Sequence, residues 1–218
     1  MTGPTRDLAM FPLGSVLFPG MPLPLRVFEP RYLAMLLSVL KQTEHEFGVV
    51  LIERGSEVGG GDVRFGVGTV ARIVSVEQTA GSIELLATGA ARFEVVQWLQ
   101  DDPFPRAQVR ELAALELDES TPSELDSAEI VVRATIARAS EFVELPWSAD
   151  IELSPELALR VWQVAGIAPL NSLDQYTLLR SSSASELLTR LVDDTAEADV
   201  LFSAGWDSDP QDDGGFPD

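Results

Sequence analysis

The side chains that most often carry catalysis are scarce in this chain. Lys41 is the only lysine among 218 residues, whereas a phosphate-binding loop needs a lysine on the terminal phosphates and a Ser-Lys hydrolase needs one beside its nucleophile. Lys41 follows a short amphipathic run, Tyr32 to Leu40, and no glycine-rich loop precedes it. We therefore expect Lys41 to be a solvated residue in the last turn of a helix, where a cation suits the helix dipole.

Cysteine and histidine chemistry is equally limited. The chain has no cysteine, which excludes disulfides, thiolate zinc sites and cysteine nucleophiles. Its single histidine, His45, lies in the polar stretch 42–46, which is typical of an exposed turn between a helix and a strand. A catalytic triad needs a histidine buried against a carboxylate, and one imidazole beside Glu44 and Glu46 is a weak metal signal. We expect no catalytic residue, no metal site and no cofactor.

One glycine motif is similar to part of a nucleotide-binding turn. Gly66–Ala71 reads Gly-Val-Gly-Thr-Val-Ala, and such a turn holds a pyrophosphate only where it lies between a strand and the N-terminus of a helix. The residues that follow, Arg72–Val76, are rich in β-branched side chains and are typical of a strand. We therefore interpret Gly66 as a strand glycine and expect no bound nucleotide.

Carboxylates alone offer a second hypothesis, a carboxylate-based hydrolase. Two carboxyl side chains can catalyse hydrolysis when one of them has a raised pKa and both are held at a defined separation in a cleft. The candidate pairs, Asp193–Asp194 and Asp212–Asp213, are adjacent in sequence, so their side chains point in different directions on a helix or lie in a mobile tail. Solvated charge is the favoured interpretation, and we expect a protein that is not an enzyme.

Charge is distributed unevenly along the chain. The formal net charge is −20; residues 1–110 hold 12 acidic and 10 basic side chains, and residues 111–218 hold 23 and 5. Nucleic acid binding demands a clustered basic surface, so we expect no nucleic-acid partner, and RNA binding is a weaker alternative. Residues 205–218 combine five aspartates with glycine and proline, which predicts a disordered acidic tail.

Composition also bounds the location and size of the fold. Residues 1–7 lack the basic and apolar regions of a secretory signal, and no apolar run reaches the 18 residues of a membrane span. We expect a cytoplasmic location and no membrane partner. A content of 45% hydrophobic residues can bury a substantial core.

The first half is predicted to be β-structure with one inserted helix. Pro30 suits the first position of a helix, and apolar residues recur at helical spacing from Tyr32 to Leu40. Strands are predicted at Phe47–Ile52, Phe65–Glu77, Ser82–Thr88, Arg92–Leu99 and within Phe104–Leu117, with Gly81 and Gly89 between them. Such closely spaced strands favour an antiparallel barrel or sandwich.

The second half has the signals of a four-helix bundle. Capping boxes are predicted at Thr121–Glu124 and Ser183–Glu186. A third helix is predicted to open at Ser154–Pro155 and to stop at Gly166, and Asn171 is predicted to cap a short fourth one. We therefore divide the chain into a β-barrel-like subdomain, 1–117, a helical bundle subdomain, 118–204, and the acidic tail, 205–218.

Four stretches in this order resemble the N-terminal, substrate-binding domain of the Lon protease family. They are Met10–Leu25, which reads Met-Phe-Pro-Leu-Gly-Ser-Val-Leu-Phe-Pro-Gly-Met-Pro-Leu-Pro-Leu, then Gly66–Ile73, Leu85–Phe93 and Leu178–Leu191. The resemblance covers roughly residues 8–203. It implies an α+β fold, an antiparallel pseudo-β-barrel of the PUA-like kind with one inserted helix, followed by a C-terminal helical bundle. The ATPase and protease modules of Lon have no counterpart in the sequence, so we expect a stand-alone member.

The resemblance further implies a non-enzymatic module that binds apolar segments of unfolded or partner polypeptides, as an adaptor or quality-control factor. Such recognition needs apolar surface that the fold leaves uncovered on a rigid scaffold. The candidate protein-binding residues lie in the proline-rich opening and in a later connection: Phe18, Pro19, Met21, Pro22, Trp98 and Phe104. Phe18 and Leu23 could instead close the barrel.

Overall fold

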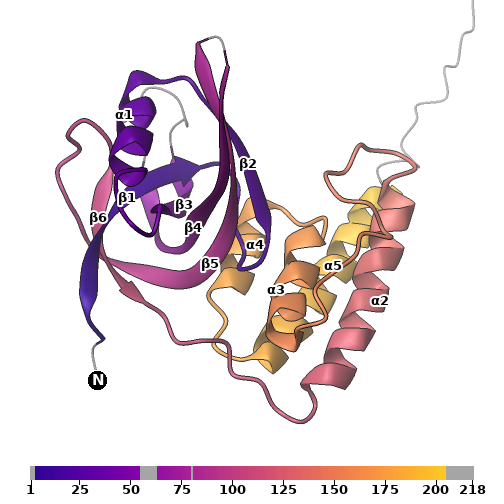
Figure 1. The fold of residues 1–218 in the computed structure, drawn as a ribbon. Helices are drawn as coiled ribbons and strands as arrows, with labels where there is room; N and C mark the ends of the chain where they lie inside the picture. Colours follow the sequence, from indigo (N-terminus) through magenta and orange to yellow (C-terminus); the bar gives the residue numbers. More distant parts are fainter. Residues whose placement is uncertain (1–2, 55–62, 80, 205–218) are drawn as a thin grey trace, which may run out of the picture.

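The computed structural model describes residues 3–54, 63–79 and 81–204. These residues form two lobes, one built from strands and one from helices (Figure 1). The predicted α+β fold, with a barrel-like sheet followed by a helical bundle, is confirmed. The predicted acidic tail, 205–218, lies outside the described residues.

The strand lobe is a six-stranded sheet that curls round on itself. Its strands are β1 Thr5–Leu13, β2 Pro22–Val27, β3 Glu46–Arg54, β4 Val63–Thr79, β5 Ser82–Trp98 and β6 Arg106–Glu111. The order is β2-β5-β4-β3-β1-β6, and β6 also pairs with β5. The inserted helix, α1 Pro30–Val39, starts at the predicted proline and buries the predicted apolar stripe.

One strand pair departs from the antiparallel prediction. β1 and β3 run parallel, with Met10 opposite Gly48 and Leu13 opposite Leu51. Parallel neighbours need a long connection, and β2 with α1 supplies it here. The strand pattern of β1 was missed because β1 is buried on both sides: Met10 packs into one apolar cluster and Phe11 into another.

β5 is one continuous strand where two were predicted. Gly89 lies inside it, and the close approach of another segment explains why this position holds a glycine. A Cβ atom at Gly89 would lie 2.2 Å from the carbonyl oxygen of Phe18. The first part of β5 pairs with β2 and its last part with β6, so β5 joins the two ends of the sheet.

The helical lobe comprises four helices among the described residues. They are α2 Thr121–Ala139, α3 Leu157–Ile167, α4 Ser172–Leu179 and α5 Ala184–Ala204. Asn171 caps α4 as predicted, because its side-chain oxygen accepts hydrogen bonds from the backbone N–H groups of Leu173 and Asp174. Ser183 accepts a hydrogen bond from the Glu186 N–H at the start of α5.

Two helix boundaries differ from the prediction. The N-cap of α2 is Ser120, and the Thr121 hydroxyl does not cap the helix: its oxygen accepts from the Asp118 N–H, and it donates to the Asp118 carboxylate. α3 begins at Leu157, three residues after the predicted Ser154, and it contains Gly166, which was predicted to stop it.

The main hydrophobic core runs through both lobes. It joins α1 and the inner face of the sheet to α2, α3, α4 and α5 in a single cluster. A smaller cluster within the barrel contains Met10, Val50 and Phe93. The subdomain limits at 117 and 204 remain a prediction.

Candidate functional site

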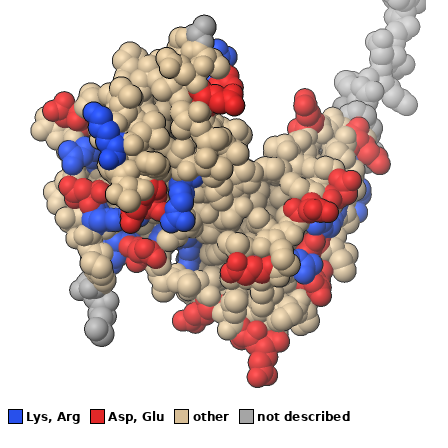
Figure 2. Space-filling view, viewed as in Figure 1, with Lys and Arg blue, Asp and Glu red and all other residues tan. Residues whose placement is uncertain are grey.

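An apolar groove lies between the two lobes. Its volume is about 810 Å³, within the range of roughly 300–1,000 Å³ found for ligand pockets. The groove is lined by Ser15, Val16, Leu17, Phe18, Met21, Pro22, Leu23, Pro24, Leu145, Pro146, Trp147, Gly166, Ile167, Ala168, Pro169, Leu170, Asn171, Gln175 and Phe202. None of these side chains is charged, and Figure 2 shows the hollow between the lobes free of blue or red atoms along its walls.

The barrel wall of the groove is built on a tight turn. The Met21 N–H donates to the Phe18 carbonyl at 3.2 Å, and Gly20 between them has φ of 75°, which glycine adopts without steric cost. The turn is tied to β5, because Gly20 donates to the Gly89 carbonyl at 2.8 Å and Gly89 donates to the Met21 carbonyl at 2.9 Å. The proline-rich opening is therefore held rigidly against the sheet.

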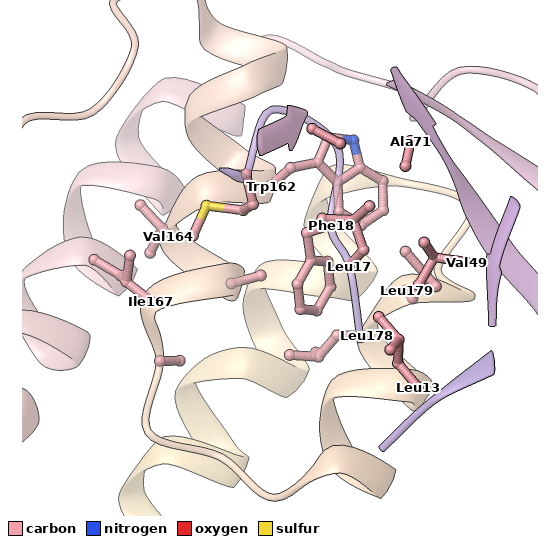
Figure 3. Close-up of a cluster of buried hydrophobic side chains, with 14 of the residues drawn as sticks. Leu13, Leu17, Phe18, Val49, Ala71, Trp162, Val164, Ile167, Leu178 and Leu179 are labelled. Atoms are coloured by element: carbon pink, nitrogen blue, oxygen red, sulfur yellow. The ribbon is translucent and has the colours of Figure 1, made fainter. Parts of the chain in front are cut away.

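The same turn docks onto α3 of the helical lobe. The ring of Phe18 lies 6.0 Å from the ring of Trp162, in the middle of the buried cluster of Figure 3. Met21 packs over Gly166, where a Cβ atom would lie 2.7 Å from the Met21 Cγ. Gly166 therefore forms a notch for Met21 inside the helix.

Arg92 on β5 joins the lobes through a buried guanidinium. It donates to the carbonyls of Leu179 at 2.8 Å, Ser181 at 2.6 Å and Ala113 at 3.0 Å, and it stacks 4.7 Å from the centre of the Trp162 ring. Burial lowers the pKa of Arg92 from its ordinary value. The three carbonyls and the ring fix the distance between the walls of the groove.

β2 forms an edge beside the groove that resists pairing with another strand. The Met21 carbonyl accepts a hydrogen bond from the Gly89 N–H of β5. In an antiparallel pair, every second residue of a strand directs its backbone groups toward the partner strand. Pro22 and Pro24 lie at the other positions of β2, where the backbone nitrogen faces away from β5. Proline has no N–H to offer there. A bound segment would therefore be recognised by contacts with its side chains and not by backbone hydrogen bonds as an additional strand.

The opposite wall includes a loop, residues 144–153, that is anchored by an ion cluster. Arg133 donates hydrogen bonds to the carbonyls of Ala149 and Ile151 in the loop. The Glu129 carboxylate forms ion pairs with Arg133, at 2.7 Å, and with Arg160, at 2.6 Å. Burial acts to raise the pKa of Glu129, but hydrogen bonds from Arg133 and Arg160 outweigh it and the pKa is lowered. This cluster holds Trp147, next to the anchored stretch, at the groove.

The six sequence-predicted site residues separate into two groups. Phe18, Met21 and Pro22 line the groove, and Pro19 is buried in the turn between them. Phe18 is 1% exposed and Met21 is 6% exposed, so these two form the wall and offer little free surface. Pro22 is exposed.

The other two predicted residues lie away from the groove. Trp98 is half-buried under the guanidinium of Arg64, 4.8 Å from the ring centre. Phe104 is buried in the main core. Neither lines the groove, because Trp98 ends β5 on the side of the barrel where β5 pairs with β6 and not with β2.

The groove-lining residues of the helical lobe were not predicted from the sequence. Leu145, Trp147, Leu170 and Phe202 are half-buried apolar residues that line it. Three of them lie outside the helices, where a large apolar side chain has no periodic pattern to explain it. The pair Pro146-Trp147 in a polar connection was the signal that could have indicated them.

The described residues considered for catalysis do not line this groove, and the candidate pair Asp212–Asp213 lies outside the described residues. Lys41 and His45 are exposed near the end of α1, and His45, which follows a bend at residues 42–44, has φ of 50°. Asp194 has a raised pKa because of burial and the nearby Asp174 carboxylate. Within residues 3–54, 63–79 and 81–204, no group of three or more His, Asp or Glu side chains could hold a metal ion. No helix in the part that the structure describes is long and apolar enough to cross a membrane.

Comparison with known proteins places this chain in a family. Residues 7–193 match the model of the ATP-dependent protease La (LON) substrate-binding domain. The chain therefore belongs to the LON substrate-binding domain family, as its sequence resemblance predicted.

Relatives agree with this assignment. The Lon protease of Magnetococcus marinus is 37% identical over 108 residues, which cover 47% of this chain and 13% of that protease. The Lon protease of Anaeromyxobacter dehalogenans is 35% identical over 106 residues, 47% of this chain and 12% of the relative. The matched stretches thus span only a small part of those proteases.

Solved structures share the architecture. A Lon N-terminal domain protein from Xanthomonas campestris matches with a TM-score of 0.62 and 25% identity, over 86% of this chain and 98% of its own. The N-terminal domain of a Mycobacterium avium complex Lon protease matches with a TM-score of 0.63 over 88% and 99%, and at 17% identity it supports the fold alone.

Proposed function

We propose that this protein is a binding module that recognises apolar segments of partner polypeptides and catalyses no reaction on them. The observation that carries the proposal is the uncharged groove of about 810 Å³ between rigidly joined lobes. Removing apolar side chains from water is worth about 25 cal/mol per Å², and a preformed groove adds little ordering cost. Membership in a substrate-binding family supports the same conclusion.

The groove suits a segment that is unfolded or extended. Its walls come from Val16, Leu23, Trp147, Leu170 and Phe202, which are half-buried and keep part of their apolar surface free. Phe18 and Met21 support these walls from behind. An occupant would bury its side chains among them, with Pro22 in contact at the rim.

The biological setting of this binding is an adaptor or quality-control role in the cytoplasm. A segment with exposed apolar side chains is typical of an unfolded or damaged polypeptide, which such a role must detect. Neither a carboxylate-based hydrolase nor an RNA-binding domain is favoured by an observation at the groove, because its walls carry neither acids nor bases.

A matched pair of leucine variants tests the proposal. Leu170 is half-buried in the groove wall, whereas Leu173 is 59% exposed in α4 and does not line the groove. We expect Leu170→Asn to weaken binding of a fluorescent, denatured model polypeptide about tenfold, with Leu173→Asn unchanged. Circular dichroism melting of both variants identifies any loss that comes from unfolding. Equal affinity of both folded variants for the polypeptide would contradict the proposal.

A further inference from the structure

The groove continues onto the outer face of the barrel. A second, shallower hollow of about 420 Å³ is lined by Pro24, Leu25, Arg26, Ser75, Glu77, Glu84, Leu85 and Leu86. Pro24 lines both hollows, so one surface leads from the apolar groove across β2 to β5 and β4. Leu86 adds apolar surface on this path, since it is 37% exposed.

The path along β2 has a defined length. Pro22, Pro24 and Arg26 alternate along one strand, so their side chains share one face of the sheet. At about 3.3 Å per residue, Pro22 and Arg26 are about 13 Å apart along the strand. An extended segment anchored in the groove would reach the second hollow about four residues later.

The second hollow differs from the groove in charge. Glu77 and Glu84 are both exposed and lie directly opposite each other on β4 and β5, an arrangement of like charges that destabilises a strand pair. Arg26 lies opposite Glu84 on the other side, and its Nε donates to the Ser82 hydroxyl at 3.2 Å. Arg26 also lines the hollow, so its three charged side chains sum to −1, and this net negative charge attracts a cation from outside.

We propose that the groove prefers a polypeptide segment with lysine or arginine about four residues from its apolar anchor, placed over Glu77 and Glu84. This inference rests on the proposed function and adds the charge of the partner. The net charge of −20 acts in the same direction, because its field attracts cationic segments and repels acidic ones. Apolar contacts then give affinity, and the two carboxylates give selectivity.

Three fluorescent peptides test the preference. They share one apolar core and carry lysine, serine or glutamate four residues from the core on both sides, so that binding direction does not matter. Fluorescence anisotropy at low salt is expected to show the lysine peptide binding about three- to tenfold more tightly than the serine peptide. The glutamate peptide should bind more weakly than both, and higher salt should reduce the differences.

Two double variants separate a local effect from the overall charge. Glu77→Gln with Glu84→Gln should abolish the lysine advantage. Glu111→Gln with Glu119→Gln removes the same charge from exposed positions that line neither hollow, and it should keep the advantage.

The outcomes that overturn the proposals are distinct. Equal binding of the lysine and serine peptides, or an equal loss of the preference in both double variants, overturns the charge preference alone. Absence of any binding by the serine peptide overturns the proposed function itself.

Discussion

At the scale of single residues, the groove depends on two places where a side chain is absent. Gly89 lets the Phe18 carbonyl approach β5, and Gly166 lets Met21 sit in α3. Neither glycine ends its element, although glycine in a strand or helix is a common signal of a break. Close packing between the opening turn and the rest of the fold therefore explains both positions.

We expect Gly89→Ala to destabilise the protein. A Cβ atom 2.2 Å from a backbone oxygen forces the turn away from β5, and overpacking of this kind costs about 1–3 kcal/mol. Gly66→Ala is the matched control, since Gly66 lies in β4 with nothing within 4 Å of its added Cβ. Denaturant unfolding of the two variants measures the difference, and similar stabilities would contradict the close contact.

Met21 should also behave as a core residue. It is 6% exposed and packs on Gly166, so Met21→Ala should lower the free energy of unfolding by about 2–5 kcal/mol. Leu37→Ala, at a position 59% exposed on α1, should change it by less than about 0.5 kcal/mol. A melting temperature of Met21→Ala equal to that of the unaltered protein would show that Met21 does not pack as described.

At the scale of elements, the groove needs β2, α3 and the loop 144–153 to keep fixed relative positions. Arg92 ties β5 to the end of α4 through the carbonyls of Leu179 and Ser181. The cluster of Glu129 with Arg133 and Arg160 ties the loop to α2 and α3. The Arg92 anchor therefore joins the two lobes, and the Glu129 cluster holds the loop within the helical lobe.

The loop anchor should make stability depend on pH. The folded pKa of Glu129 is lowered from its ordinary 4.5, so its contribution is complete above pH 4.5 and is lost as pH falls through the folded pKa. At pH 7, Glu129→Gln should cost about 1.5–3 kcal/mol, as expected for hydrogen bonds to a charged group. Urea unfolding at pH 7 and pH 3 measures this, and the difference from the unaltered protein should shrink at pH 3. A difference that stays constant would contradict the ion pairing.

At the scale of the whole molecule, the sequence predicted the fold class and several elements. The apolar stripe after Pro30 and the cap at Asn171 are local signals, and both elements formed as expected. β1 and β2 were not predicted, because β1 is buried on both faces and β2 carries prolines at its free edge. The opening turn was identified as part of the site, but Leu170 and Phe202 meet it only through the tertiary fold.

We have proposed that a polypeptide binds between the lobes. Because the chain has no cysteine, single cysteines can be introduced without background and labelled with a photo-reactive group. Pro22→Cys and Pro146→Cys place the label at exposed positions on the two walls, and Leu173→Cys places it outside the groove. After illumination with a denatured model polypeptide, we expect strong cross-links from Pro22→Cys and Pro146→Cys and few from Leu173→Cys. Equal yields from all three positions, or cross-links from Leu173→Cys alone, would contradict it.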